Sequence, residues 1–426
     1  MKKVAEFDDA IWDKGIEVWK SILEYRRAKK NPTKSQLEYF NLYIEYLEKL
    51  QRARDEGGFI VAHATTIPAE IFYAMDMVPY LLVGTCFAIT QCVRQHPKFM
   101  MVAKDYGISD DTCSAHKGII AHSVQGVLPK PNVFVEVGAG CDAFSNSMKI
   151  SADLYDVPLF QVDAPYYDDA DSIDYLAREF GELIHFLEIE SGHKMDWDRL
   201  VGLLHNSQRM IELSREVWEL RKSFPTPMDN RRAWETNWIN WFFSGTTEGI
   251  RYWEILRDEL KERVEKKKGA YPKKERFRIL DLFMAPAHDL QILEWMQEEW
   301  GANIVAELLI FYRPDYEVEP ENPLKTMAER WFAGPLWNVT QGPTTNYCRE
   351  AVKAAKEFNV DAAIWWDQKA CRQAGAINLV KNALGKEANI PTARINVDIT
   401  DPSFVTPQEM RNSLSTFFEI LESGNK

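Results

Sequence analysis

Two of the six cysteines, Cys141 and Cys371, occupy equivalent places in two copies of one local sequence pattern. Each follows a short apolar run typical of a buried strand, at residues 132–138 and 360–366. Each then precedes a helical stretch and a proline-led strand that ends at an aspartate. Ligands of open α/β sheets bind beyond the carboxyl ends of parallel strands. We therefore expect both cysteines where two half-domains face each other, as metal ligands rather than as a disulfide.

A third cysteine, Cys113, stands at a polar approach to a predicted helix. A cysteine near a helix N-terminus is biased toward the thiolate, which is the form that binds metal. Three thiolates would leave one iron of a 4Fe-4S cluster without a protein thiolate and open to substrate or solvent. Any one cysteine can instead be a buried core thiol. We adopt that structural interpretation for Cys86, Cys92 and Cys348.

Composition argues against several classes of partner. A formal charge of −13 over 426 residues speaks against nucleic acid or an anionic membrane surface. The first residues lack the apolar segment of a secretory signal, and the longest apolar run, residues 77–90, is too short to span a bilayer. A cytoplasmic chain is therefore expected, in which six cysteines indicate thiols or metal ligands rather than a disulfide framework.

Several nucleotide-binding and hydrolase motifs do not occur in the sequence. There is no Gly-x-x-x-x-Gly-Lys-Ser/Thr phosphate loop. Gly138 and Gly140 open no complete Gly-x-Gly-x-x-Gly pattern, because Ala143 occupies the third glycine position. Neither a His-Glu-x-x-His helix nor a Gly-x-Ser-x-Gly elbow is present. If the reaction uses ATP, another chain must bind it.

The alternation of strands and helices predicts an α/β fold with two Rossmann-like parallel-sheet units. Within the first helical segment, residues 35–38 (Ser-Gln-Leu-Glu) have the pattern of a capping box. Four segments are expected: a helical arm (1–56), a first α/β unit with Cys113 and Cys141 (57–171), a helical region and linker (172–275), and a second α/β unit with Cys371 (276–426).

Two further features each have a functional and a structural interpretation. The basic stretch at residues 266–278 is either a solvated linker or a contact for the phosphates of an anionic substrate such as coenzyme A. Four tryptophans in the helical region are either core residues or apolar surface for a partner subunit: Trp234, Trp238, Trp241 and Trp253.

These residues resemble the family of 2-hydroxyacyl-CoA dehydratases and ATP-dependent benzoyl-CoA reductases. The resemblance covers nearly all of the chain after the helical arm. It rests on the order and spacing of several motifs, none specific by itself: residues 67–70 (Ile-Pro-Ala-Glu), 111–114 around Cys113, Cys141, 157–165, 322–328, Cys371 and 390–401.

The resemblance implies one 4Fe-4S cluster in each chain, held by Cys113, Cys141 and Cys371. It also implies three kinds of partner: a homologous second subunit, a separate iron-sulfur ATPase that activates the enzyme by delivering one electron, and an acyl-CoA substrate. The separate ATPase agrees with the missing phosphate loop.

The implied reaction is dehydration of a 2-hydroxyacyl-CoA to an enoyl-CoA through a ketyl radical, after ATP-driven one-electron activation. Two alternatives stay open. The chain is a subunit of a benzoyl-CoA reductase, in which the electron enters an aromatic ring, or it is a non-catalytic subunit that relays electrons.

The candidate catalytic residues are His63, Thr65 and Glu70. In the dehydratases that the chain resembles, the loop before the Pro-x-Glu helix offers a serine, and a carboxylate follows that helix. Here the loop offers His63, Thr65 and Thr66, and residues 80–84 contain no carboxylate. Thr65 or His63 is expected to hydrogen-bond a substrate oxygen. In the alternative interpretation, Thr65 and Thr66 only cap the helix.

Overall fold

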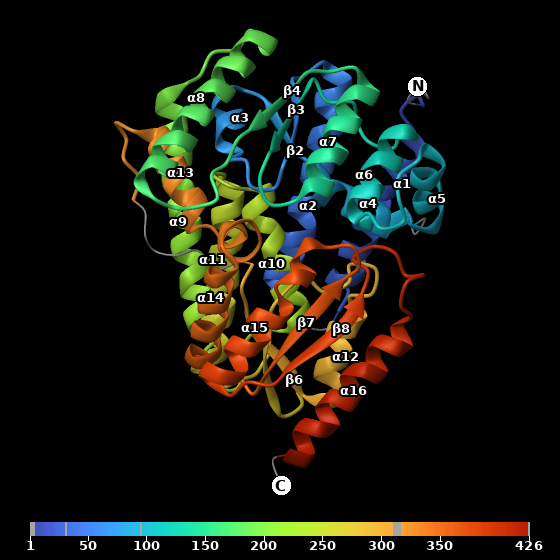
Figure 1. Cartoon of the computed structure of the whole chain (residues 1–426), viewed down its shortest axis with the longest axis vertical. Helices are drawn as coiled ribbons and strands as arrows, with labels where there is room; N and C mark the ends of the chain where they lie inside the picture. The colour runs from blue at the N-terminus through green and yellow to red at the C-terminus, as the bar shows by residue number, and fades with distance from the viewer. Residues whose placement is uncertain (1–4, 30–31, 94–95, 310–316, 425–426) are drawn as a thin grey trace.

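Two four-stranded parallel sheets covered by helices form the body of the chain (Figure 1). The computed structural model describes residues 5–29, 32–93, 96–309 and 317–424. In spatial order, the first sheet contains β2 (Val78–Leu81), β1 (Ile60–His63), β3 (Val133–Val137) and β4 (Leu159–Val162). The second contains β6 (Ala302–Glu307), β5 (Phe277–Asp281), β7 (Ala362–Gln368) and β8 (Thr392–Val397). The α/β class with two parallel-sheet units is confirmed.

The two sheets have the same strand order. In each, the unit's first strand lies between its second and third strands, and its fourth strand pairs with its third. Every residue of β3 and of β7 is buried, as expected for parallel strands with helices on both faces. Because all pairings are parallel, the carboxyl ends of each sheet lie along one edge.

Helices surround both sheets and connect them. The helical arm consists of α1 (Asp9–Arg27) and α2 (Lys34–Glu56). The first unit carries α3 (Glu70–Ala74), α4 (Leu82–Val93), α5 (His96–Tyr106), α6 (Ser114–Val124) and α7 (Asp142–Tyr155). The connecting region consists of α8 (Ala170–Ser191), α9 (Trp197–Leu220), α10 (Asn230–Phe242) and α11 (Thr247–Glu265).

The second unit contributes one helix to the other half of the molecule. Its helices are α12 (Gln291–Trp300), α13 (Pro323–Ala333), α14 (Thr344–Glu357), α15 (Ile377–Ala383) and α16 (Pro407–Gly424), with short turns η1 (Trp337–Gln341), η2 (Arg372–Gly375) and η3 (Leu384–Ala388). Helix α13 packs against α8 and α9, beside the first sheet's unit (Figure 1). The chain between β6 and β7 therefore reaches from the second unit toward the first.

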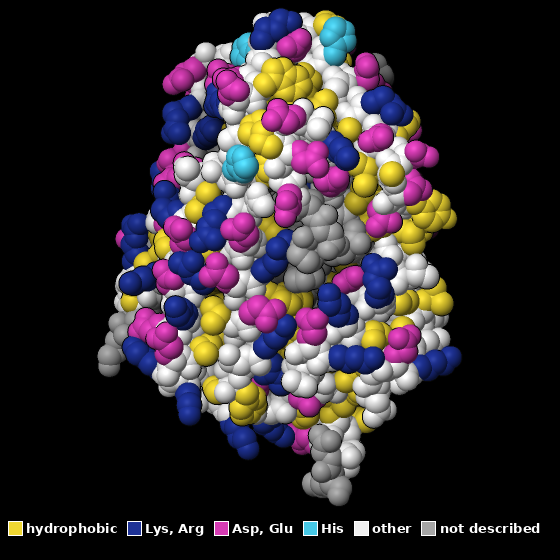
Figure 2. Space-filling view, turned by 90° about the vertical axis from the view of Figure 1, so that its left-hand side faces the viewer, with side chains coloured by type: hydrophobic (Ala, Val, Ile, Leu, Met, Phe, Trp, Pro, Cys, Tyr) yellow, Lys and Arg dark blue, Asp and Glu magenta, His cyan; other side chains and the backbone are white. Residues whose placement is uncertain are grey.

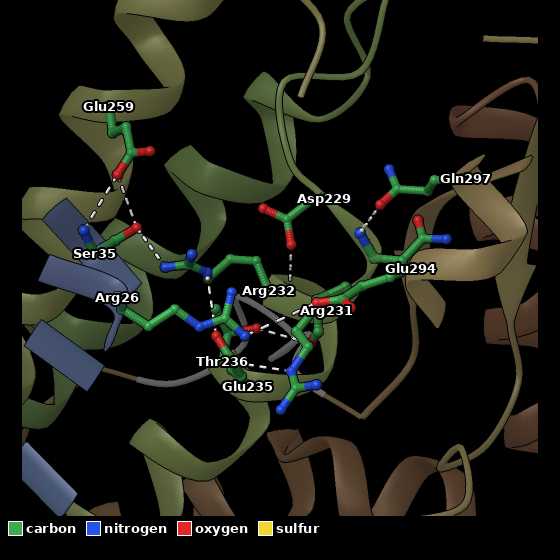
Figure 3. A network of polar contacts seen from close by, with 12 residues as sticks. Arg26, Ser35, Asp229, Arg231, Arg232, Glu235, Thr236, Glu259, Glu294 and Gln297 are labelled. Atoms are coloured by element: carbon green, nitrogen blue, oxygen red, sulfur yellow. Dashed lines mark hydrogen bonds and ion pairs between the residues drawn. The ribbon is translucent and has the colours of Figure 1, made fainter. Parts of the chain in front are cut away.

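A buried polar network joins the helical arm to the connecting region (Figure 3). The Ser35 hydroxyl donates to Glu259 (2.8 Å) and accepts from the Arg232 guanidinium (2.7 Å). The predicted capping box at residues 35–38 is wrong, because α2 already begins at Lys34 and its N-cap is Thr33. The Ser35 side chain instead hydrogen-bonds Glu259, and Glu259 also accepts a hydrogen bond from the Ser35 backbone N–H (3.2 Å).

The four tryptophans of the helical region are core residues. Trp253 is fully buried, and Trp241, the most exposed of the four, is 7% exposed. Rings of α10 pack on one another, with the Trp234 and Trp238 centroids 5.6 Å apart. Their interpretation as a surface for a partner subunit is therefore wrong, because the chain's own helices cover them.

The basic stretch at residues 266–278 leads into the amino end of β5. Lys266 pairs with Glu262, and Arg276 pairs with Glu422. The amino end of a parallel strand lies at the edge opposite its carboxyl end, so these side chains lie away from the edge that carries Cys371. This position and its exposure favour the solvated linker for residues 266–274, whereas Glu275, Phe277 and Arg278 are buried.

The surface carries charges of both signs. On the face shown in Figure 2, Lys and Arg alternate with Asp and Glu instead of forming a field of one sign. Within the described ranges, no helix combines the length and the apolar character needed to cross a membrane.

Replacing Arg221 by methionine is expected to destabilise the second unit by about 3–5 kcal/mol. Arg221 is fully buried and donates to both carboxylate oxygens of Glu307, which would be left buried without its counter-charge. Urea unfolding measures the change. Arg209→Met is the control, because its ion pair with Glu212 is exposed and worth at most about 1 kcal/mol. Equal losses in both variants would contradict the proposed importance of the buried pair.

Candidate functional site

The three cysteines predicted as ligands line one cavity of about 180 Å³ between the two units. Cys113 precedes α6, Cys141 precedes α7 and Cys371 precedes η2, and each is the N-cap residue of its helix. Cys141 follows β3 and Cys371 follows β7, so the cavity lies where the carboxyl ends of the two sheets face each other. The structure thus brings together three residues that are far apart in the sequence.

The two repeat cysteines are positioned by the same backbone device. The residue immediately before each one has a positive φ, 94° at Gly140 and 60° at Ala370. This left-handed residue turns the chain sharply from the strand into the following helix. Alanine at the second position accepts a conformation that L-residues rarely adopt, which indicates that the surrounding structure imposes the turn.

The three cysteines that line the cavity would, as thiolates, favour a positively charged ligand. Burial raises the pKa of all three thiols, that of Cys371 to about 11, and the neighbouring cysteines raise the pKa of Cys113 further. Backbone N–H groups at each helix start act in the opposite direction, because they hydrogen-bond the sulfur atoms. Three such thiolates are stable together only beside a positive charge. The donor set therefore fits an iron-sulfur cluster.

The spacing of the thiols also differs from that of a single-ion site. Among the described residues, no three His, Cys, Asp or Glu side chains are grouped closely enough to hold one metal ion. In an iron-sulfur cluster each thiolate binds its own iron, so the ligands are spread around the cluster. Three separated cysteines on one cavity are compatible with this second arrangement.

Two residues of the cavity were missed in the sequence. Arg372 lies beside Cys371, donates to the Gly140 carbonyl (2.8 Å) and lowers the pKa of both Cys141 and Cys371 by its charge. It thereby links the two cysteine loops. His116 places Nε2 3.4 Å from the Cys141 sulfur, and burial lowers its pKa to about 4, which keeps it neutral. Their adjacency to the cysteines was the only available signal.

A buried network holds the Cys113 junction to the second unit. Ser114 donates to the Asp398 carboxylate, and the Thr400 hydroxyl donates to Ser114 (2.8 Å). Asp398 also accepts the Thr400 backbone N–H (3.0 Å). The aspartate directly after β8 therefore fixes the start of α6, which belongs to the first unit.

The three candidate catalytic residues lie in different surroundings. Thr65 lines the cysteine cavity together with Thr66. Neither caps α3, whose N-cap is Ala69 with no side-chain hydrogen bond, so the capping interpretation is wrong. His63 is buried at the end of β1, where Nδ1–H donates to the Ala64 carbonyl (3.0 Å) and burial lowers its pKa to about 4. It is not among the residues that line the cavity.

Glu70 forms a fully buried ion pair instead of facing the cysteines. Arg330 of α13 binds both of its carboxylate oxygens, and Ser207 and Ser244 donate to one of them. Burial acts to raise the pKa of Glu70, but the Arg330 charge and these hydrogen bonds outweigh it and lower the pKa to about 2. A proton-transfer role for Glu70 would require this pair to open.

Comparison with known proteins gives the family of the chain. The sequence model of a family described as "2-hydroxyglutaryl-CoA dehydratase, D-component" matches residues 64–421, which include all three cysteines. A relative from Thauera aromatica, one of the subunits of its benzoyl-CoA reductase, is 24% identical over 93% of this chain and 97% of its own. The "(R)-2-hydroxyisocaproyl-CoA dehydratase alpha subunit" of Clostridioides difficile is 23% identical over 91% and 96%. The alpha subunit of the lactoyl-CoA dehydratase of Anaerotignum propionicum is 20% identical over 72% and 73%.

Glu70→Gln is expected to lower the free energy of unfolding at pH 7 by about 3 kcal/mol. The folded-state pKa of about 2 lies below the ordinary value of about 4.3, so the carboxylate contributes stability above pH 4.3 that is lost as the pH falls through 2. The variant should therefore also lose less stability on acidification. Urea unfolding at a series of pH values measures both effects.

Glu262→Gln is the matched control, because its ion pair with Lys266 is solvent-exposed and contributes little. If Glu70→Gln is as mild as this control at neutral pH, Glu70 is not the structural carboxylate that its contacts indicate.

Proposed function

Because the chain belongs to the 2-hydroxyglutaryl-CoA dehydratase D-component family, we propose that it is the iron-sulfur subunit of a radical acyl-CoA enzyme, a 2-hydroxyacyl-CoA dehydratase. The observation that carries the proposal is the convergence of three N-cap cysteines on one cavity at facing sheet edges. Cys113, Cys141 and Cys371 would hold one 4Fe-4S cluster. When bound, such a cluster supplies a single electron and an iron atom with an open coordination position.

The chain's own residues have three tasks in this reaction. Thr65 presents a hydroxyl at the cavity wall, where it hydrogen-bonds and orients a substrate oxygen. The largely apolar lining excludes water, which would otherwise quench reactive intermediates; it includes Val83, Phe87, Phe144, Trp238 and Phe283. Arg372 holds the two cysteine loops together and places a positive charge beside two of the thiolates.

The substrate chemistry requires this one-electron route. The β-hydrogen of a 2-hydroxyacyl thioester is not acidic, and hydroxide is a poor leaving group. One electron added to the thioester carbonyl makes a ketyl radical, which expels the 2-hydroxyl group. The resulting radical has an acidic β-hydrogen, and loss of this proton and then of the electron leaves the enoyl-CoA. The net reaction is loss of water, with the electron returned.

A role in a benzoyl-CoA reductase is the second candidate. One relative that aligns with 93% of this chain is named as part of such an enzyme. Aromatic side chains are prominent in the cavity and would suit a flat ring, among them Phe87, Phe144, Trp241 and Phe283. In that reaction the electron is consumed by the ring instead of being recycled. A third outcome, a subunit that only relays electrons, would leave the cavity without an acyl substrate.

Two protein partners belong to the proposal. Each of the relatives is named as one subunit of its enzyme, which supports a homologous second subunit here. The sequence contains no phosphate loop, so a separate iron-sulfur ATPase would provide the energised electron. We place the complex in the cytoplasm, where thiols stay reduced and available for metal.

Anaerobically purified protein is expected to be brown and to hold about four iron atoms per chain. Cys113→Ala, Cys141→Ala and Cys371→Ala should each lose iron, because each removes one thiolate from the cavity. Cys348→Ala is the control, since Cys348 lies within α14 and does not line the cavity. Iron and sulfide assays measure the content. Full iron content in all three ligand variants would rule out the assignment.

Turnover of a CoA thioester is expected to require ATP, a strong one-electron donor, the second subunit and the separate ATPase, and to stop in air. A dehydratase should need only catalytic ATP because the electron is recycled, whereas a reductase should hydrolyse ATP in proportion to product. ATP consumed per product in a reconstituted anaerobic mixture distinguishes the two. Aerobic turnover by this chain alone, without ATP, would contradict the proposed function.

A further inference from the structure

His116 lies between two of the cysteine junctions. Cys113 is the N-cap of α6, and His116 belongs to the first turn of the same helix. Its imidazole lines the cysteine cavity and places Nε2 3.4 Å from the sulfur of Cys141, the N-cap of α7. The ring also packs on Phe144 of α7, with the two ring centroids 5.1 Å apart. This packing against α7 holds the imidazole at the Cys141 sulfur.

The direction of this hydrogen bond follows from what each atom can donate or accept. A cysteine that binds iron has lost its proton, so its sulfur can only accept, and Nε2 must carry the hydrogen. The other ring nitrogen, Nδ1, is then unprotonated; it is buried and has no hydrogen-bond partner in the described part of the chain. The opposite tautomer would bury an N–H without an acceptor and turn a nitrogen lone pair toward the sulfur, which is costly.

This contact distinguishes Cys141 from the other two cysteines. Within the described ranges, its sulfur is the one of the three with a side-chain hydrogen-bond partner, whereas Cys113 and Cys371 receive hydrogen bonds from the backbone. The cavity is largely apolar, so water weakens a hydrogen bond to a charged sulfur little. The charge of Arg372 also acts on Cys141, but this side chain is exposed and solvent screens its effect.

A donor at a ligand sulfur affects how easily a cluster takes up an electron. Reduction adds one negative charge to the cluster and its thiolates, and no bond is made or broken. A hydrogen bond that draws charge from a thiolate stabilises the reduced form more than the oxidised form, which raises the reduction potential. In the proposed function a low-potential one-electron donor reduces the cluster, so this potential determines how readily the electron is accepted.

We propose that His116 is a positioning residue that donates a hydrogen bond from Nε2 to the Cys141 sulfur and thereby makes the cluster easier to reduce. The inference rests on the proposed function, because it assumes that Cys113, Cys141 and Cys371 hold a 4Fe-4S cluster. It adds to that function a residue of α6 that binds no iron and acts through a ligand sulfur.

The test is a redox titration of the anaerobically purified protein, with the reduced cluster followed by electron paramagnetic resonance. His116→Phe keeps an aromatic ring beside Phe144 but cannot donate. Its equilibrium constant for one-electron reduction should fall about tenfold, which lowers the midpoint potential by about 59 mV. His116→Gln restores an N–H near the position of Nε2 and should recover most of the wild-type midpoint. His205→Phe is the control, because His205 is exposed on α9 and does not line the cavity.

A second measurement is made on the wild-type protein and decides the matter if His116→Phe loses iron. The protein is labelled with histidine that contains the heavy nitrogen isotope, and its cluster is reduced. Of the described residues that line the cavity, His116 is the only histidine. A nitrogen hydrogen-bonded to a cluster sulfur should couple weakly to the unpaired electron. Absence of this coupling, or the strong coupling of a nitrogen bound directly to iron, would overturn the proposal.

Iron content, measured in every variant, separates the two claims. An unchanged midpoint in His116→Phe at full iron content would overturn the role of His116 and leave the proposed cluster intact. Equal midpoints in the Phe and Gln variants would do the same, because the donor would then make no difference. If the wild-type protein holds no iron, the proposed function fails, and this inference fails with it.

Discussion

Three thiols that lie within electrostatic reach of one another in a largely apolar cavity stay protonated unless a positive charge is placed beside them. Burial raises the pKa of Cys113, Cys141 and Cys371, and the N–H groups at three helix starts only partly offset that effect. The proposed cluster would supply that charge where the carboxyl edges of the two sheets face each other. Such a cluster would also need each junction to be held firmly, because it accepts ligands only at set separations.

Hydrogen bonds and an ion pair between segments that are distant in the sequence hold these junctions in place. Asp398, at the end of the second sheet, receives hydrogen bonds from the start of α6 in the first unit. Arg372 binds the carbonyl of Gly140 across the two cysteine loops. The buried pair of Glu70 and Arg330 fastens α13 to α3. The two units therefore act as one scaffold around the cavity, and their relative position is part of the site.

A second, smaller cavity shares lining residues with the cysteine cavity, and the two neighbouring cavities differ in the polarity of their walls. The cysteine cavity is largely apolar, whereas the smaller one has a more polar wall that includes Arg330, whose charge is balanced by Glu70. Thr65 and Thr66 line both spaces, so the loop before α3 lies between them.

The sequence by itself predicted several strands and the repeat that carries Cys141 and Cys371, because each depends on residues that are near neighbours in the chain. Cys113 was found for the same reason. Tertiary structure alone decided that Glu70 forms an ion pair with Arg330, 260 positions away. It also decided that Ser35 hydrogen-bonds Glu259 instead of capping its own helix. A buried polar group takes whichever partner the packing of distant elements brings to it, and local spacing does not encode that choice.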